Sequence, residues 1–206
     1  MTVLDERAVS ATSQPTTARL ARRAMIDSQL RTSGVNEDFV LAAMNRVARE
    51  DFVPAAVRDA AYIDRAIPLG DGRFLAAPLV QARMLAEAAP IAADNALLIS
   101  GGSGYLAELL RPLVGSLEVI EAEAFAARRK KGSFSLIVID GAIEQLPDGL
   151  AAQLAEGGRI VTGLVSRGVT RLAAGRKLAG TVTLLPLAEL GIPVLPEFAA
   201  PQRWSF

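Results

Sequence analysis

The residues best suited to bind a ligand lie in a glycine-rich turn that follows a short apolar run. Gly102 and Gly104 have no Cβ atom, so the backbone can turn tightly there and approach a ligand closely. A helix beginning near Tyr105 would point its free amide groups at that ligand. Glu121 ends the next apolar run and can accept hydrogen bonds from the two hydroxyls of a ribose. We expect a nucleotide-type cofactor here; glycines that serve only strand–helix packing are the alternative.

The elements that would position this turn alternate between apolar runs and helical patterns. Such alternation predicts an α/β fold with a parallel, doubly wound sheet. Asp140 ends one of the runs, at the edge of the sheet where ligands bind in such folds. The tail at 181–198 is strand-like but interrupted by prolines, which favours edge pairing or loops. The expected strands are 96–100, 117–121, 134–140 and 159–165, and the expected helices include 79–89, 106–114 and 146–158.

The first part of the chain has a different character. Residues 1–16 show no clear period and are expected to form a flexible arm. Residues 17–90 are expected to form a helical cap with a substrate-loop region, in which Asn36 is the predicted N-cap of a second helix. The stretch 61–78 is rich in turn formers and is expected to be a surface loop. Residues 91–206 would then form the α/β domain, as one structural unit with the cap.

Composition excludes much chemistry. The 206 residues contain no cysteine and no histidine. Disulfides, cysteine nucleophiles, Ser-His-Asp hydrolysis and nearly all zinc sites are thereby excluded, and we expect no metal. Lys plus Arg and Asp plus Glu both number 22, so the formal net charge is zero and general nucleic-acid binding is not expected. No long apolar run and no secretory signal are visible, so we expect a cytoplasmic protein without a membrane partner.

The glycine turn alone does not distinguish a nicotinamide cofactor from S-adenosyl-L-methionine. The region before this turn does distinguish them. The ordered residues there resemble the N-terminal part of the bacterial protein-L-isoaspartate O-methyltransferases. The resemblance is strong over about 25–78 and continues through the glycine turn, Glu121, 134–147 and 157–161. Its motifs are Met25-Ile26-x-x-Gln29-Leu30, Gly34-Val35, Val40-Leu41-x-x-Met44, Val47-Ala48-Arg49-Glu50-x-Phe52-Val53-Pro54 and Ala61-Tyr62-x-Asp64-Arg65-x-Ile67-Pro68-Leu69-Gly70.

This resemblance implies a Rossmann-like S-adenosylmethionine-dependent methyltransferase fold with an N-terminal helical cap. It implies methyl transfer to L-isoaspartyl carboxylates of damaged proteins, which would be the partners; a homodimer is left open. The donor's methyl group is already activated, so positioning dominates the reaction and no histidine is needed. The cofactor-binding positions that it implies are Ser100, Gly102, Gly104, Glu121 and Asp140, and those of the substrate loop are Phe74, Ala76, Ala77 and Pro78.

The chain departs from the family pattern in the substrate loop. A serine that is implicated in holding the substrate carboxylate is replaced by Ala76, which has no hydroxyl. A hydrogen bond to a charged group contributes about 1.5–3 kcal/mol, so its loss would slow the reaction about 10- to 150-fold without forbidding it. Phe74 also places a bulky ring where the family has a small polar side chain.

The chain also departs from the family in the adenine pocket. Only 12 residues separate Glu121 from Phe134, so one helix–strand unit of the family fold is expected to be missing, with weaker or lost binding of the donor. Ser100 replaces the first glycine of the family's GxGxG turn, and its Cβ would crowd the methionine end of the donor. A catalytically degenerate member that serves as a non-enzymatic binding or interaction module is therefore the alternative to an active enzyme.

Overall fold

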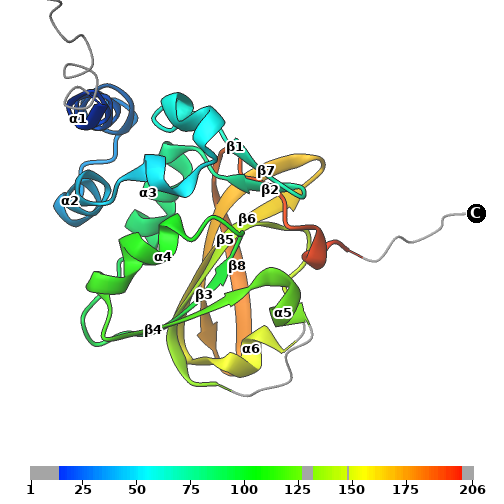
Figure 1. Ribbon diagram of the computed structural model, residues 1–206. Helices are drawn as coiled ribbons and strands as arrows, with labels where there is room; N and C mark the ends of the chain where they lie inside the picture. The colour runs from blue at the N-terminus through cyan, green and yellow to red at the C-terminus, as the bar shows by residue number, and fades with distance from the viewer. Residues whose placement is uncertain (1–13, 127–131, 148, 201–206) are drawn as a thin grey trace, which may run out of the picture.

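The computed structural model describes residues 14–126, 132–147 and 149–200, which are built around one six-stranded sheet (Figure 1). The strand order is β4-β3-β5-β6-β7-β8. The first four strands in this order are mutually parallel, whereas β7 and β8 each run antiparallel to the strand before it. The bounds are β3 Asn95–Ser100, β4 Ser116–Glu121, β5 Phe134–Ile143, β6 Leu154–Ser166, β7 Val169–Leu178 and β8 Thr181–Glu189.

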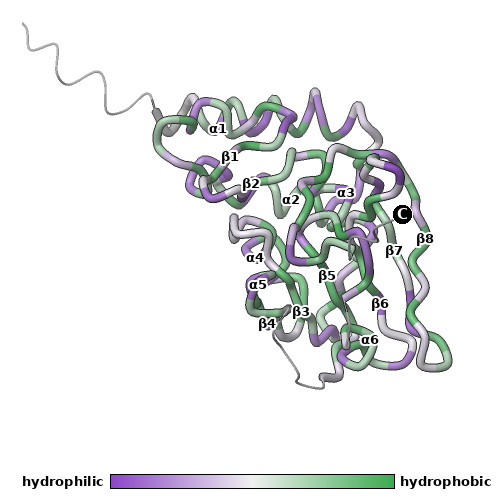
Figure 2. The backbone as a smooth tube through the Cα atoms, turned by 90° about the vertical axis from the view of Figure 1, so that its right-hand side faces the viewer, coloured by the Kyte–Doolittle hydropathy of each residue, from purple (hydrophilic) through white to green (hydrophobic). Residues whose placement is uncertain are grey.

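Helices cover both faces of the parallel strands, and the side chains of these strands alternate between two apolar layers. In β3, Ala96 and Leu98 face the layer beneath α3 and α4, whereas Leu97 and Ile99 face the layer beneath α5 and α6. Continuous apolar runs are required because both faces are buried, and the central strands are largely green in Figure 2. The doubly wound α/β prediction is therefore confirmed. The helices are α3 Pro78–Ala88, α4 Tyr105–Leu110, α5 Ala122–Ala126 and α6 Leu150–Gln153.

The antiparallel end of the sheet was predicted only in part. β8 is an edge strand and contains Pro186, as the proline-broken tail indicated. β7 was not predicted, because its residues mix charged and small side chains without a clear apolar run. The predicted helix over 146–158 is wrong in extent: only α6 is helical, and β6 begins at Leu154.

The N-terminal region packs its helices against the same apolar layer as α3. α1 (Gln14–Met25) continues into a π-helical turn (Ile26–Leu30), and α2 (Asp38–Arg46) follows. The predicted N-cap is wrong: Glu37 occupies that position, and its carboxylate accepts a hydrogen bond from the Asn36 N–H at 3.0 Å. The predicted arm lies outside the described residues except at 14–16, which begin α1. No helix among the described ranges is long and apolar enough to cross a membrane.

The predicted surface loop at 61–78 contains a small hairpin. β1 (Ile67–Gly70) pairs antiparallel with β2 (Arg73–Leu75). The turn between them uses positive φ angles at three successive residues, of which Gly70 (+105°) and Gly72 (+74°) tolerate them best. This hairpin leads directly into α3 and so places residues 74–78 beside the sheet.

The connection between β4 and β5 is short, as the sequence predicted. α5 follows β4 at once, and the rest of the connection up to residue 131 lies outside the described residues. Within the described part of the chain no strand lies beyond β4, which forms an edge of the sheet. Among the described residues the sheet therefore ends at β4 on this side.

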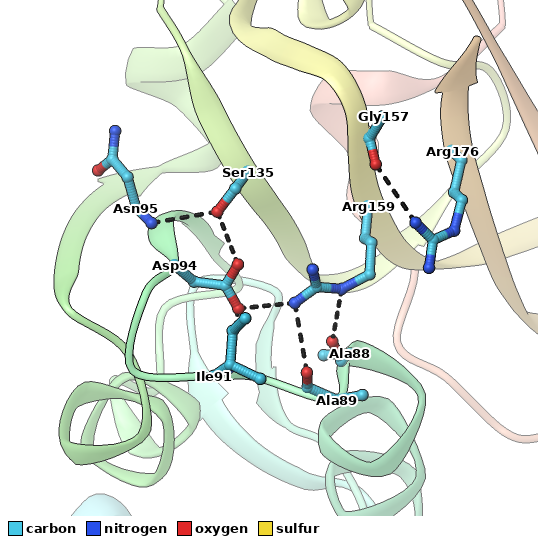
Figure 3. A network of polar contacts seen from close by, with 9 residues as sticks. All are labelled: Ala88, Ala89, Ile91, Asp94, Asn95, Ser135, Gly157, Arg159 and Arg176. Atoms are coloured by element: carbon cyan, nitrogen blue, oxygen red, sulfur yellow. Dashed lines mark hydrogen bonds and ion pairs between the residues drawn. The ribbon is translucent and has the colours of Figure 1, made fainter.

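A polar network holds together the edge of the sheet where the parallel strands begin (Figure 3). The Asp94 carboxylate accepts hydrogen bonds from the Ser135 hydroxyl (2.6 Å) and the Arg159 guanidinium (2.6 Å). Arg159 also donates to the carbonyl oxygens of Ala88 (3.2 Å) and Ala89 (3.3 Å), which end α3. This network joins α3, β3, β5 and β6 at the edge opposite the glycine turn.

Candidate functional site

Three of the predicted site residues meet at the carboxyl edge of the parallel strands. Ser100 and Glu121 are register partners at the ends of β3 and β4. Asp140 follows Ile139, the register partner of Ile99, at the end of the regular part of β5. The pairing of β5 with β6 shifts between Val138 and Ala142, and such irregularities often redirect a side chain beside a functional site.

The glycine turn lies between these strand ends and approaches β5 closely. Gly102 and Gly104 have φ angles of +97° and +72°, which disfavour residues with a Cβ. A Cβ on Gly101 would collide with the carbonyl oxygen of Asp140. The Ser100 hydroxyl accepts a hydrogen bond from the Gly102 N–H at 3.0 Å, so this side chain stabilises the turn.

Asp140 is a buried carboxylate with few strong partners. The Gln81 side-chain amide lies 3.4 Å from each of its oxygens, and the Ser103 hydroxyl also interacts with it. Burial raises the pKa of Asp140 to about 6, although Gln81 and the positive charge of Arg49 act in the opposite direction. A carboxylate in this environment is stabilised when a cation approaches it.

Arg49 belongs to the resemblance motif, but sequence reasoning gave it no role. It is fully buried and donates to the Ala61 carbonyl (2.7 Å), to Gln81 Oε1 (2.7 Å) and to the Ala76 carbonyl. Its guanidinium also lies 5.0 Å from the centre of the Tyr105 ring. Burial lowers the pKa of Arg49 to about 10, which leaves it charged at neutral pH. Arg49 therefore fixes the backbone of the predicted substrate loop next to the start of α4.

The predicted substrate loop offers no hydrogen-bonding side chain. Ala76 and Ala77 are buried, Phe74 is 40% exposed, and Pro78 is the first residue of α3. Asp64, which precedes the hairpin, accepts a hydrogen bond from the Leu79 N–H at 3.3 Å and so supports the start of α3. An anion at this loop would have to find its donors among backbone amides or on neighbouring elements.

A second arginine whose role the sequence did not reveal is Arg73 of β2, whose side chain extends from the hairpin to the glycine turn. Its aliphatic part packs so closely against Gly102 that a Cβ on this glycine would lie 3.3 Å from Arg73 Cγ. The guanidinium forms ion pairs with Glu123 of α5 and with Glu197 near the C-terminal end of the described chain. Two carboxylates from separate segments thus converge on one cation at the glycine turn.

The C-terminal segment crosses the same edge of the sheet. The Leu195 N–H donates to the Ala142 carbonyl (2.8 Å), and the Ala142 N–H donates to the Pro193 carbonyl (2.7 Å). Phe198 packs edge-on against Phe125 of α5, with ring centres 6.0 Å apart. Apolar side chains of the tail therefore cover the sheet beside the shortened connection.

The residues at this edge suit a donor that carries a ribose and a positive charge. Glu121 is exposed at the end of β4, so its carboxylate is accessible to hydroxyl groups. Asp140 supplies a buried negative charge beside the glycine turn. Gly102 and Gly104 allow the turn to approach a ligand closely, so the residue types present fit S-adenosyl-L-methionine.

Comparisons with known proteins identify relatives of this chain. The family model of protein-L-isoaspartate(D-aspartate) O-methyltransferase matches residues 21–127. A protein-L-isoaspartate O-methyltransferase of Koribacter versatilis is 36% identical, and the match covers 78% of this chain and 84% of the relative. A relative of the same name from Methanoculleus marisnigri is 29% identical, covering 87% and 94% of the two chains.

Solved structures share the fold. One from Plasmodium falciparum, described as a protein-L-isoaspartate O-methyltransferase in complex with S-adenosyl-L-homocysteine, superposes with a TM-score of 0.68 at 18% identity. The match covers 87% of this chain and 98% of the other. Another protein-L-isoaspartate O-methyltransferase superposes with a TM-score of 0.69 at 16% identity and covers 86% and 67%.

Proposed function

Because the chain belongs to the protein-L-isoaspartate(D-aspartate) O-methyltransferase family, we propose that it transfers a methyl group from S-adenosyl-L-methionine to L-isoaspartyl carboxylates of damaged proteins. The observation that carries this proposal is the convergence of Ser100, Glu121 and Asp140 around the glycine turn. These residues meet at the carboxyl edge of the parallel strands, so this edge supplies groups that suit the donor.

The residues of the chain act by positioning. Glu121 would hold the ribose hydroxyls of the donor, and Gly102 and Gly104 would let the backbone approach it. Asp140, which is held by Gln81, would balance the positive charge of the donor. The donor, when bound, supplies an activated sulfonium methyl group. Holding the two reactants in line is then the main task of the protein, which fits a chain without histidine or cysteine.

The acceptor is placed by the substrate loop, residues 74–78. Arg49 fixes this loop through the Ala76 carbonyl, so its backbone is positioned although its serine is replaced. The loss of one hydroxyl slows the transfer rather than preventing it. Damaged proteins with L-isoaspartyl residues are the proposed partners. The cytoplasm is the proposed location, and a homodimer stays a prediction.

Calorimetric titration of the purified protein with S-adenosyl-L-homocysteine tests the donor half of the proposal. We expect a dissociation constant on the order of micromolar to tens of micromolar. Glu121→Gln should weaken binding about tenfold, because it removes a charged hydrogen-bond acceptor. The matched variant Glu108→Gln changes the same charge on the exposed side of α4 and should leave affinity unchanged. No heat at millimolar ligand would contradict the proposal and favour a non-enzymatic binding module.

A further inference from the structure

We propose that Arg73 binds the acceptor carboxylate directly, in the place that the carboxylate of Glu123 occupies in the free protein. This inference rests on the proposed function, because it names how the acceptor of that same site is held. An ion pair with Arg73 would then hold the acceptor carboxylate, since the substrate loop has no hydroxyl that could do so.

The need for such a group follows from the substrate loop. All five side chains from Phe74 to Pro78 are apolar, so none can donate a hydrogen bond to an anion. The nearest buried cation, Arg49, already donates to Ala61, Gln81 and Ala76. Burying a carboxylate without a partner is costly, so an acceptor anion requires another donor close to the loop.

Arg73 is in the right place to be that donor. It immediately precedes the substrate loop on β2, and its aliphatic part lies on Gly102 of the glycine turn. Its side chain thus passes over the glycine turn, and its guanidinium lies beside Glu123 of α5 and Glu197. A guanidinium group carries five N–H donors, so Arg73 can keep Glu197 and still donate to one further carboxylate.

The two carboxylates already on Arg73 differ in exposure. The side chain of Glu197 is 13% exposed, and its carboxylate accepts hydrogen bonds from both terminal nitrogens of Arg73, one of them at 3.3 Å. Burial alone would raise the pKa of Glu197, but the hydrogen bond and charge of Arg73 outweigh it and lower the pKa. Glu197 therefore stays ionised and orients the guanidinium. Glu123 is 60% exposed, and exposed ion pairs contribute little, so an incoming carboxylate can displace it.

Equilibrium binding of a peptide tests this inference without depending on turnover. The probe is a short peptide with one L-isoaspartyl residue, compared with the same peptide carrying a carboxamide in place of that carboxylate. Wild type should prefer the carboxylate peptide. Arg73→Gln should bind it about 10- to 100-fold more weakly and lose the preference, whereas Arg73→Lys should keep part of both. Arg171→Gln, which breaks an ion pair between β7 and β8, is the matched control and should behave as wild type.

Removal of the competing carboxylate should have the opposite effect. Glu123→Gln should tighten binding of the carboxylate peptide by about two- to fivefold relative to Glu108→Gln, which changes net charge equally at an exposed site. If Arg73 only held the segments together, Glu123→Gln would not improve binding. Equal binding by Arg73→Gln and wild type, or no gain in Glu123→Gln over Glu108→Gln, would overturn the inference. Titration with S-adenosyl-L-homocysteine decides the proposed function separately.

Discussion

The buried guanidinium of Arg49 and the buried carboxylate of Asp140 are joined through the side-chain amide of Gln81. Arg49 donates to Gln81 Oε1 at 2.7 Å, and Gln81 Nε2 lies 3.4 Å from both oxygens of Asp140. The amide therefore bridges the two buried groups. Burial of Asp140 outweighs the effects of Gln81 and Arg49 and raises its pKa to about 6, so its protonation should respond to its surroundings near neutral pH.

The stability of the protein should depend on the ionisation of Asp140. Its pKa of about 6 in the folded protein lies above the value of about 3.9 for an exposed Asp. Protonation therefore favours folding, and this contribution is lost as pH rises from about 4 through about 6. Asp140→Asn should be more stable than wild type at pH 7.5 and about equally stable at pH 4. Urea unfolding at both pH values measures this; a variant less stable at pH 7.5 would contradict the account.

Ionisation of Asp140 should also affect the affinity for S-adenosyl-L-homocysteine, but in the opposite direction to its effect on stability. The ammonium group at the amino-acid end of S-adenosyl-L-homocysteine favours the ionised carboxylate, so this ligand should bind more tightly as pH rises through about 6. Asp140→Asn should remove most of this pH dependence. Titrations at pH 5 and pH 7.5 check the prediction, and an unchanged pH profile in the variant would show that Asp140 does not face the ligand's charge.

A hydroxyl restored at position 76 should accelerate methyl transfer. Under the proposed function, Ala76→Ser supplies a hydroxyl that can donate to the acceptor carboxylate, and one charged hydrogen bond corresponds to a gain of about tenfold or more in kcat/KM. Ala77→Ser is the matched control, because Ala77 is also buried in the same loop. An equal gain in both variants would indicate a general effect of loop polarity rather than a specific hydrogen bond.

Gly102 should tolerate substitution less well than another glycine with positive φ. A methyl group at Gly102 meets both a φ of +97° and the aliphatic part of Arg73. Gly72 has a φ of +74°, but no atom lies within 4 Å of the position that a Cβ would take there, so Gly72→Ala measures backbone strain alone, about 1 kcal/mol. Gly102→Ala should cost more free energy of unfolding and also weaken ligand binding. Equal costs would show that the contact with Arg73 is unimportant.

Loss of the Asp94 carboxylate should lower the stability of the protein without changing its affinity for the ligand. Burial alone would raise the pKa of Asp94, but hydrogen bonds from Ser135, the Ile91 N–H and Arg159 outweigh it and lower the pKa. Its contribution is therefore present above the unfolded value of about 3.9 and lost as pH falls through the folded value. Asp94→Asn should lower the free energy of unfolding at pH 7 by about 1–3 kcal/mol.

The matched control for that variant is Asp27→Asn, which removes exposed ion pairs on one helix and should change stability by less than about 1 kcal/mol. Ligand affinity should be unchanged in both variants, since Asp94 lies just before the start of β3 whereas the glycine turn follows the end of this strand. A loss of ligand binding in Asp94→Asn at a temperature where the variant is folded would contradict this separation.

The sequence predicted the parallel strands because burial on both faces requires unbroken apolar runs such as 96–100. It also predicted that Ser100, Glu121 and Asp140 lie near one another, since the carboxyl ends of parallel strands share one edge of the sheet. It did not predict β7, whose charged and small residues give no strand signal, or the β1–β2 hairpin, whose turn residues favoured a loop.

The two arginines of the site could not be assigned from sequence. Arg49 and Arg73 act through long side chains that reach elements far along the chain, as far as Glu197 in the case of Arg73. Spacing along one helix or strand carries no information about such partners. The membership of Arg49 in the resemblance motif was the one signal that pointed to it.

Transfer of a labelled methyl group from S-adenosyl-L-methionine to an L-isoaspartyl peptide tests the central claim most directly. The peptide with an ordinary aspartyl residue in the same position is the control. The account predicts label in the isoaspartyl peptide alone, released by mild base as expected for a methyl ester. Absence of label in a preparation that binds S-adenosyl-L-homocysteine would contradict the claim that this edge of the sheet methylates isoaspartyl carboxylates.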